Sequence, residues 1–320
     1  MNKYVRRTLE RVAVTVCCRR TKGDGVPIDP EHVDVFPLAK LTNDKATNAV
    51  NLKLNQAAAD GIVWLKSQRV MEANLINLDC NKIFGQLIMA EGESNKFVIF
   101  LHGYRNCGVN DGGSFLKWLH DLGYNVLLVD QQACGKSQGD YESFGLVESR
   151  DTLQWIYQLI HQFGPDIKIA LFGVSMGATT ALMTMGHNAV PKQVVACISD
   201  CAYTTAEAVI NHMAGNFHIK NAYYYANRGY ELKTGENMDE VDALSAVKNM
   251  RQPVLFIHGD KDATDPTSMA HDLYSACASA DKELYLVEGA NHAQSSVLGK
   301  DYRTKVAALL DRAFSAELPE

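Results

Sequence analysis

A Gly-x-Ser-x-Gly pentapeptide at residues 173–177 constrains the fold of this chain more than any other feature of its sequence. Residues 168–173 form a short, nearly unbroken apolar run typical of a buried strand, and residues 176–186 have the Ala, Leu and Met content of a helix packed on a sheet. A serine on such a sharp strand-to-helix turn has a strained backbone, and only glycine avoids collisions at positions 173 and 177. We therefore expect the Ser175 hydroxyl to lie beside the first amides of a helix, which stabilise developing negative charge.

The pentapeptide alone is a weak indicator of catalysis, because it occurs by chance in roughly one chain of this length in ten. The strand before it and the helix after it strengthen the interpretation of Ser175 as a nucleophile. The alternative is a tight turn between a strand and a helix in another α/β fold. The rest of the chain must therefore supply a base, an acid and a second oxyanion donor.

Strands and helices alternate along most of the chain. Residues 71–90 predict a hairpin at a sheet edge, with a polar turn at 79–82. The later alternation predicts a doubly wound, mostly parallel α/β sheet. Beyond the hairpin, the expected strands are 97–101, 125–130, 168–173, 194–199, 253–258 and 283–287, and the expected helices are 113–122, 147–163, 176–186, 266–279 and 301–315.

Two segments fall outside this alternation, and they define the expected domain organisation. Residues 1–66 carry few strand signals, and the apolar spacing over 52–65 predicts one or two helices in an N-terminal extension with a scaffolding role. Residues 67–320 form the expected catalytic domain. Within it, residues 202–250 interrupt the alternation and predict a small helical lid, or else a plain surface insertion. Aromatic side chains gather there, at Phe217 and Tyr223–Tyr225.

Composition excludes several classes of function. With 47% hydrophobic residues, 21% charged residues and a net charge of −6, the 320-residue chain resembles an ordinary soluble enzyme and not a nucleic-acid-binding protein. Its eight cysteines lack the spacing of a zinc site, so we expect no metal, and no feature indicates a cofactor. Cysteines inside predicted strands and helices suit a reducing compartment, which favours a cytoplasmic protein.

The N-terminal region does not predict stable membrane insertion. No apolar run approaches the roughly 18 residues of a membrane span. The short apolar segment Val12–Cys18 is followed at once by Arg19 and Arg20 instead of a small-residue cleavage site, which argues against a signal peptide. Contact of this Arg-flanked amphipathic segment with a membrane surface stays open. The clearest basic cluster is Arg6, Arg7, Arg11, Arg19 and Arg20.

A serine nucleophile needs a base, and the base needs a carboxylate that holds its tautomer. Two strands after the pentapeptide end in such groups: residues 253–257 lead into His258-Gly-Asp260-Lys-Asp262, and residues 284–287 lead to His292. Catalytic groups in open α/β sheets collect at the carboxyl ends of the strands. We therefore expect these groups to lie on the same edge of the sheet as Ser175.

The chain resembles the α/β-hydrolase superfamily over about residues 70–315. The resemblance rests on His102-Gly103 after a strand, the Gly-x-Ser-x-Gly turn, His258-Gly-x-x-Asp262 and His292. It implies the α/β-hydrolase fold, with a sheet of about eight strands and a small helical lid. It also implies that Ser175 is the nucleophile, His292 the general base and Asp262 the acid, with an oxyanion hole formed by the backbone amides of Tyr104 and Met176.

Several other residues compete for these roles. Asp260 and Asp265 lie near Asp262 in the sequence, and Asp200 ends the preceding strand, where some members of the superfamily carry the acid. The resemblance implies that His258 and His102 brace loops and do not transfer protons.

Two further features bear on the site. Cys107 is either a reactive thiol near the oxyanion loop or an ordinary free cysteine. The stretch Gln132-Ala-Cys-Gly135 departs from the Arg before a Gly-His-Gly turn that is usual in the superfamily. We expect this departure to alter the floor of the pocket without affecting the triad.

The leading functional hypothesis is hydrolysis of a carboxylic ester through an acyl-enzyme on Ser175, with a small-molecule ester or acyl compound as the partner. The alternatives are a peptidase similar to the prolyl-oligopeptidase branch, a thioesterase or acyltransferase, and a non-catalytic binding protein on a hydrolase scaffold. The aromatic residues of 202–250 favour an apolar acyl or aryl group. Nothing in the sequence indicates the oligomeric state.

Overall fold

The structure is a computed structural model that describes residues 3–33, 45–215 and 218–318. Residues 1–2, 34–44, 216–217 and 319–320, and with them Phe217 of the predicted lid, lie outside the described residues.

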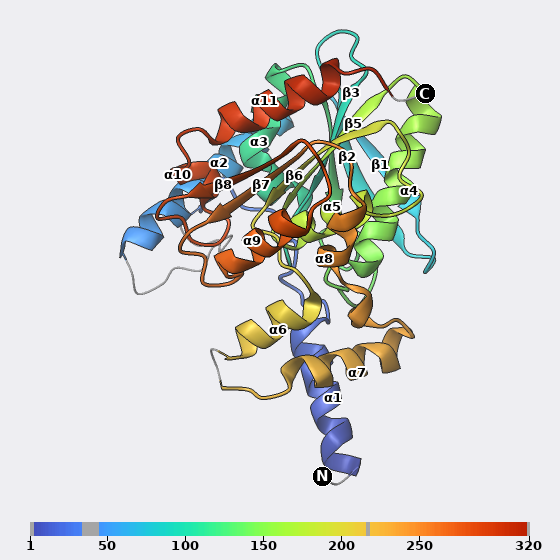
Figure 1. Cartoon of the computed structure of the whole chain (residues 1–320), viewed down its shortest axis with the longest axis vertical. Coiled ribbons are helices and arrows are strands. Elements are labelled where there is room, and N and C mark those ends of the chain that lie inside the picture. Colours follow the sequence, from blue (N-terminus) through green and yellow to red (C-terminus); the bar gives the residue numbers. More distant parts are fainter. Residues whose placement is uncertain (1–2, 34–44, 216–217, 319–320) are drawn as a thin grey trace.

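A single eight-stranded sheet forms the centre of the molecule (Figure 1). Its strand order is β1-β2-β4-β3-β5-β6-β7-β8. β1 and β2 form the predicted antiparallel hairpin at one edge, β2 pairs antiparallel with β4, and the other neighbours are parallel. The predicted fold class is confirmed. The strands are β1 (Val70–Ile76), β2 (Lys82–Ile88), β3 (Lys96–Leu101), β4 (Asn125–Asp130), β5 (Lys168–Val174), β6 (Val194–Asp200), β7 (Val254–Gly259) and β8 (Lys282–Val287).

Helices cover both faces of the sheet, and alternate residues of each strand point to opposite helical layers. In β3, Val98 and Phe100 pack against one layer, whereas Ile99 and Leu101 pack against the other. Both faces are thus buried, which explains the unbroken apolar runs of the central strands. The first layer contains α3 (Gly108–Asp121), α11 (Tyr302–Ser315) and the end of α2 (Lys45–Lys66); the second contains α4 (Leu146–Phe163), α5 (Met176–Met185), α8 (Ala243–Ala246) and α9 (Thr267–Ala276).

The N-terminal region contains two helices, as the sequence predicts. α2 packs along α3, whereas α1 (Lys3–Cys17) lies away from the sheet beside α7 (Ala222–Thr234) (Figure 1). α7 belongs to the predicted lid segment, together with α6 (Ala206–Gly215), the 3₁₀ turns η1 (Met238–Glu240) and η2 (Val247–Asn249), and α8. A short helix, α10 (Ser295–Leu298), precedes α11.

The turn between β5 and α5 has the strained geometry that the pentapeptide predicts. Ser175 has a left-handed φ of 54° with ψ of −121°. A Cβ atom on Gly173 would lie 2.1 Å from the carbonyl oxygen of Gly177, and one on Gly177 would lie 2.1 Å from the carbonyl oxygen of Leu101. Both glycines are therefore required by close backbone contacts, the second one with β3.

Replacing Gly177 with alanine is expected to destabilise the protein by about 1–3 kcal/mol, because β3 and α5 must separate to accommodate the added methyl group. Urea unfolding measures the change in free energy. Gly23→Ala is the matched control, since no atom lies within 4 Å of its Cβ position. An alanine at 177 that leaves stability at the wild-type value would show that the contact is relaxed without cost.

Candidate active site

Three side chains from distant parts of the sequence form one hydrogen-bonded series. His292 Nε2 lies 2.9 Å from Ser175 Oγ, and His292 Nδ1 lies 2.8 Å from Asp262 Oδ2. Because a carboxylate accepts at Nδ1, that nitrogen carries the proton, and Nε2 is free to accept from the serine hydroxyl. The structure thus brings together the serine, histidine and aspartate that the sequence predicted for the site.

The parallel sheet explains why these residues meet. Ser175 follows β5, while Asp262 and His292 follow β7 and β8, and all three strands end at the same edge. The backbone amide of Ser175 donates to the carbonyl oxygen of Asp200 at 2.8 Å, which extends the pairing of β5 with β6 into the turn.

Asp262 is held rigidly by its own loop. Its Oδ1 accepts hydrogen bonds from the backbone amides of Thr264 and Asp265, both at 2.9 Å, which leaves Oδ2 for His292. Burial alone would raise the pKa of Asp262, but its interactions with His292 and the other neighbouring donors hold that pKa below its usual value. The carboxylate form is therefore favoured at this position.

The competing carboxyl groups are placed differently. Asp265 Oδ2 lies 3.8 Å from His292 Nδ1 and forms no hydrogen bond with described residues, and burial raises the pKa of Asp265 to about 7. Asp260 accepts from the amide of Gly289 at 2.7 Å. Asp200 accepts from the Tyr302 hydroxyl at 2.8 Å, and burial raises its pKa to about 7. Only Asp262 among these groups hydrogen-bonds His292.

The two other histidines after strands contact loop backbone. His102 Nε2 accepts from the amide of Gln131 at 2.9 Å, so Nδ1 carries the proton and donates to the carbonyl oxygen of Gly103 at 2.7 Å. His258 Nε2 donates to the carbonyl oxygen of Asp265 at 2.7 Å. Burial lowers the pKa of both rings and keeps them neutral. These contacts fit the expected bracing role.

The loop after β3 carries one of the expected oxyanion donors. A Cβ on Gly103 would lie 3.4 Å from Ser175 Cβ, so this loop borders the serine. Tyr104 follows Gly103, and Met176 is the first residue of α5. Neither of their backbone amides donates to another group in the described part of the chain. Both N–H groups are thus available near the serine.

Asp111 positions this loop, and the sequence reasoning missed it. Its Oδ2 accepts from the amide of Gly103 at 2.6 Å, and its Oδ1 accepts from Asn106 Nδ2 at 2.5 Å. Burial raises its pKa to about 6. The available signal was an acidic residue in the first turn of the helix that follows His102-Gly103.

Cys201 was also missed. It is fully buried with a left-handed φ of 53°, and its sulfur lies near His292. One group of side chains in the described ranges could hold a metal ion, and it consists of Cys201, Asp262 and His292. Their potential ligand atoms, one from each residue, lie within 4.8 Å of one another. The same imidazole and carboxylate already hydrogen-bond each other, so a metal on these ligands would compete with that hydrogen bond.

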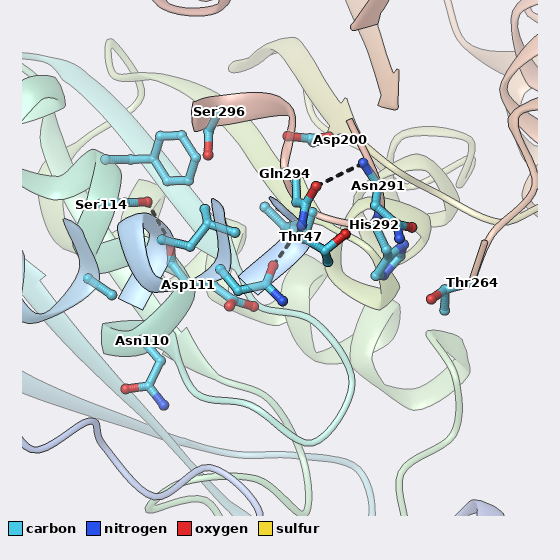
Figure 2. Close-up of a pocket in the computed structure, with 16 residues that line it drawn as sticks. Thr47, Asn110, Asp111, Ser114, Asp200, Thr264, Asn291, His292, Gln294 and Ser296 are labelled. Carbon is cyan, nitrogen blue, oxygen red and sulfur yellow. Dashed lines mark hydrogen bonds between the residues drawn. The ribbon is translucent and has the colours of Figure 1, made fainter. Parts of the chain in front are cut away.

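A cavity of about 310 Å³ opens beside His292 (Figure 2). α2 supplies part of its wall, and Gln294 bridges this helix to the loop after β8, donating to Asn51 Oδ1 at 2.6 Å and accepting from the amide of Asn291 at 3.0 Å. The N-terminal extension, for which the sequence predicted a scaffolding role, thus also supplies part of the cavity wall. The lining residues are Thr47, Asn51, Leu54, Ala58, Asn110, Asp111, Ser114, Phe115, Val174, Asp200, Thr264, Asn291, His292, Ala293, Gln294 and Ser296.

The described residues of the predicted lid, 202–215 and 218–250, do not line this cavity. Tyr223 is buried, and its hydroxyl donates to Asp239 at 2.5 Å. Tyr224 lies under the Arg6 guanidinium of α1, 5.6 Å from the ring centre. These aromatic side chains therefore pack within the segment and against α1.

The remaining predictions concern Cys107 and the stretch 132–135. Cys107 is 1% exposed, and burial raises its pKa, so the thiol stays protonated and ordinary. Gln132 Oε1 accepts from Asn77 Nδ2 at 2.8 Å in the β1–β2 turn. This stretch does not contribute to the wall of the cavity beside His292. The prediction that it alters the pocket floor is therefore wrong for that cavity.

The family comparison agrees with the fold. The family described as "alpha/beta hydrolase fold" matches residues 96–239. The chain has the α/β-hydrolase fold. It is 29% identical over 230 residues to the uncharacterized protein YqkD of Bacillus subtilis, covering 70% of this chain and 73% of YqkD. It is 24% identical over 190 residues to the protein bem46 of Schizosaccharomyces pombe, covering 59% and 58% of the two chains.

Similar solved structures include both esterases and peptidases. The Pyrococcus furiosus esterase Pf2001 superposes with a TM-score of 0.63 at 21% identity, over 78% of this chain and 94% of the esterase. A puromycin-hydrolyzing peptidase of Mycobacterium tuberculosis superposes with a TM-score of 0.59 at 18% identity, over 78% of this chain and 40% of the peptidase. At these identities the similarity establishes the shared fold.

Among the described residues, no helix combines the length and the apolar character needed to cross a membrane.

Proposed function

We propose that this protein is a serine hydrolase that cleaves carboxylic esters through an acyl-enzyme on Ser175. The observation that carries the proposal is the continuous series from Ser175 Oγ through His292 to Asp262, with distances of 2.9 and 2.8 Å. Such a series lets an imidazole remove the serine proton while a fixed carboxylate stabilises the resulting imidazolium.

The reaction divides into two steps with the same groups. Ser175 Oγ attacks the ester carbonyl carbon, its proton passes to His292 Nε2, and that nitrogen then returns the proton to the departing alcohol. In the second step, water attacks the acyl-enzyme, His292 accepts the proton of the water, and the proton returns to Ser175 as the carboxylic acid leaves. Asp262 keeps the Nδ1 proton in place throughout.

The oxyanion of each tetrahedral intermediate would be held by the amides of Tyr104 and Met176. The proposal is supported by the position of Met176 at the start of a helix and by the loop 103–104 beside the serine. Asp111 assists indirectly, since its hydrogen bonds to Gly103 and Asn106 hold the loop. It is a positioning residue and does not contact the reacting atoms.

The cavity beside His292 is the proposed binding site for part of the substrate. Amide and hydroxyl side chains are numerous in its wall, and Leu54, Phe115 and Val174 supply apolar surface. The described aromatic residues of 202–250 do not line it, so they give no support to an aryl or long apolar acyl group. A short ester with a small apolar group and a polar substituent fits this mixed lining.

Peptidase activity is the second candidate, because a puromycin-hydrolyzing peptidase and an acylaminoacyl peptidase are among the structures that share this fold. Amide hydrolysis uses the same nucleophile and base but must expel a poorer leaving group.

Free thiols at all eight cysteines are compatible with the proposed cytoplasmic location.

The proposal is tested with purified protein, a fluorophosphonate probe, and a panel of chromogenic esters and aminoacyl amides. We expect the probe to label the protein and short esters to be hydrolysed fastest. Hydrolysis of aminoacyl amides with higher kcat/KM than esters would favour the peptidase. A folded protein that neither reacts with the probe nor hydrolyses any substrate of the panel would favour the non-catalytic binding protein.

The acidic limb of the pH profile should lie above pH 6.5, the ordinary pKa of histidine. Burial alone would lower the pKa of His292, but Cys201 and the carboxylates of Asp262 and Asp265 raise it well above that value. Burial raises the pKa of the Cys201 thiol to about 12, so that thiol is neutral near pH 7. The Asp262 carboxylate is therefore the principal cause of the raised pKa of His292. Because the base must be unprotonated, kcat/KM should rise as pH increases through this pKa.

The measurement is kcat/KM for a neutral ester between pH 5 and about 9. A limb centred below pH 6.5 would contradict the raised pKa, since it would mean that burial outweighs the carboxylates around the ring.

A further inference from the structure

Helix α1 presents an apolar stripe to the solvent. Four side chains at spacings of four, three and four residues form this stripe, so they lie on one side of the helix. They are Val5, Leu9, Val12 and Val16, with exposed fractions of 51%, 38%, 54% and 63%. A helix in a globular protein normally turns such a stripe toward the core.

The opposite side of α1 is the one that packs on the protein. Val14 is 1% exposed and Glu10 is 4% exposed, and both face α7. The approach is close, because a Cβ on Gly229 of α7 would lie 2.3 Å from the carbonyl oxygen of Glu10 and 2.8 Å from Val14 Cβ. α1 is therefore docked firmly by its other face, and the stripe has no role in that contact.

Figure 1 shows α1 at the end of the molecule farthest from the sheet, with the N-terminus at its outer end. No residue of the stripe belongs to a hydrophobic cluster of the described chain. The stripe is thus accessible to an external surface without any change in the fold.

The charge of α1 has the opposite sign to that of the whole chain. The helix carries Lys3, Arg6, Arg7 and Arg11 against one acidic residue, Glu10, whereas the chain has a net charge of −6. Arg6 pairs with Glu10 at 2.9 Å. Arg7 and Arg11 are exposed and form no ion pair with described residues, so their charge is available to a partner.

We propose that α1 binds the surface of an anionic phospholipid bilayer, with the apolar stripe in the headgroup region and the exposed arginines attracting the helix to the anionic surface. Basic residues combined with an apolar stripe are typical of helices that lie in the plane of a membrane surface. A second copy of the chain is a poorer occupant, because paired stripes would bring arginines of both copies together. Four half-exposed side chains also fall short of the roughly 1,200 Å² that a stable interface buries.

Vesicle flotation tests the proposal. The full-length protein is mixed with vesicles of phosphatidylcholine alone or with about 30% phosphatidylglycerol, at low and high salt. We expect binding to the anionic vesicles that weakens with salt. The double substitution Leu9→Gln and Val12→Gln should weaken it by at least about tenfold. Val63→Gln is the matched control, because Val63 lies on α2 and is 54% exposed, as Val12 is.

The outcomes separate the occupants of the stripe. Arg7→Gln and Arg11→Gln should reduce binding to anionic vesicles while circular dichroism stays unchanged. The proposal is overturned by equal binding to both kinds of vesicle, by no binding to either, or by an equal loss with Val63→Gln. A dimer in light scattering that the Leu9 and Val12 substitutions dissociate, without lipid binding, would assign the stripe to a second copy.

Discussion

Replacing Ser175 with alanine is expected to lower kcat for ester hydrolysis by about 10⁶-fold. The substitution removes the oxygen that would attack the carbonyl carbon, and His292 Nε2 loses the hydroxyl that lies 2.9 Å away. The alanine retains the Cβ position and the strained turn, so the fold should be preserved. Single-turnover and steady-state assays with the fastest ester of the panel measure the loss.

The control for this result is Ser296→Ala. Ser296 lines the cavity beside His292 and forms no hydrogen bond with His292 in the described structure, so its loss should change kcat by less than about tenfold. Unfolding curves for both variants should match the wild type. If the Ser175 variant remains folded and keeps more than a tenth of wild-type kcat, Ser175 is not the nucleophile and the proposed function fails.

Replacing Asp262 with asparagine should lower kcat by about 10⁴-fold. The asparagine side chain can donate a hydrogen bond to Nδ1, which would favour the histidine tautomer with its proton on Nε2. That tautomer cannot accept the serine proton. The lost negative charge should also move the acidic limb of the remaining activity to lower pH, because burial would then dominate the pKa of His292.

Asp265→Asn provides a matched comparison at the same ring. Its carboxyl oxygen is 3.8 Å from His292 Nδ1, one ångström farther than that of Asp262, and burial raises its pKa to about 7, so it carries less negative charge than Asp262 near pH 7. We expect less than about a tenfold loss of kcat from this change. The reverse order of effects, with the larger loss at 265, would assign the acid to Asp265.

The elements that the sequence predicted well are those with local signals. The strands β3 to β7 could be recognised as apolar runs in the sequence because helices cover both faces of the sheet. The Gly-x-Ser-x-Gly turn could be recognised because close backbone contacts require its two glycines. The meeting of Ser175 with Asp262 and His292 followed from a general property of parallel sheets, that strand ends share an edge. Helix boundaries were less accurate: α3 begins at Gly108, five residues before the predicted start.

Contacts between segments that are distant in the chain could not be predicted from local sequence patterns. Residues 45–66 show helical periodicity, but periodicity does not indicate that Asn51 reaches Gln294 or that Leu54 borders the cavity. The aromatic residues of 202–250 suggested substrate contacts by their composition, whereas Tyr223 and Tyr224 pack against η1 and α1 in the structure. Asp111 was missed because an acidic residue in the first turn of a helix does not by itself indicate which loop its carboxylate holds.

The wall that α2 contributes has a consequence for how proteins with this fold diversify. The hydrogen-bonded groups proposed for catalysis all come from strand ends, whereas Asn51, Leu54 and Ala58 come from a helix before the sheet. Substitutions in that helix can reshape the recognised compound while leaving proton transfer intact. Exchanging residues 45–66 between relatives is therefore a direct route to new selectivity on an unchanged reaction centre.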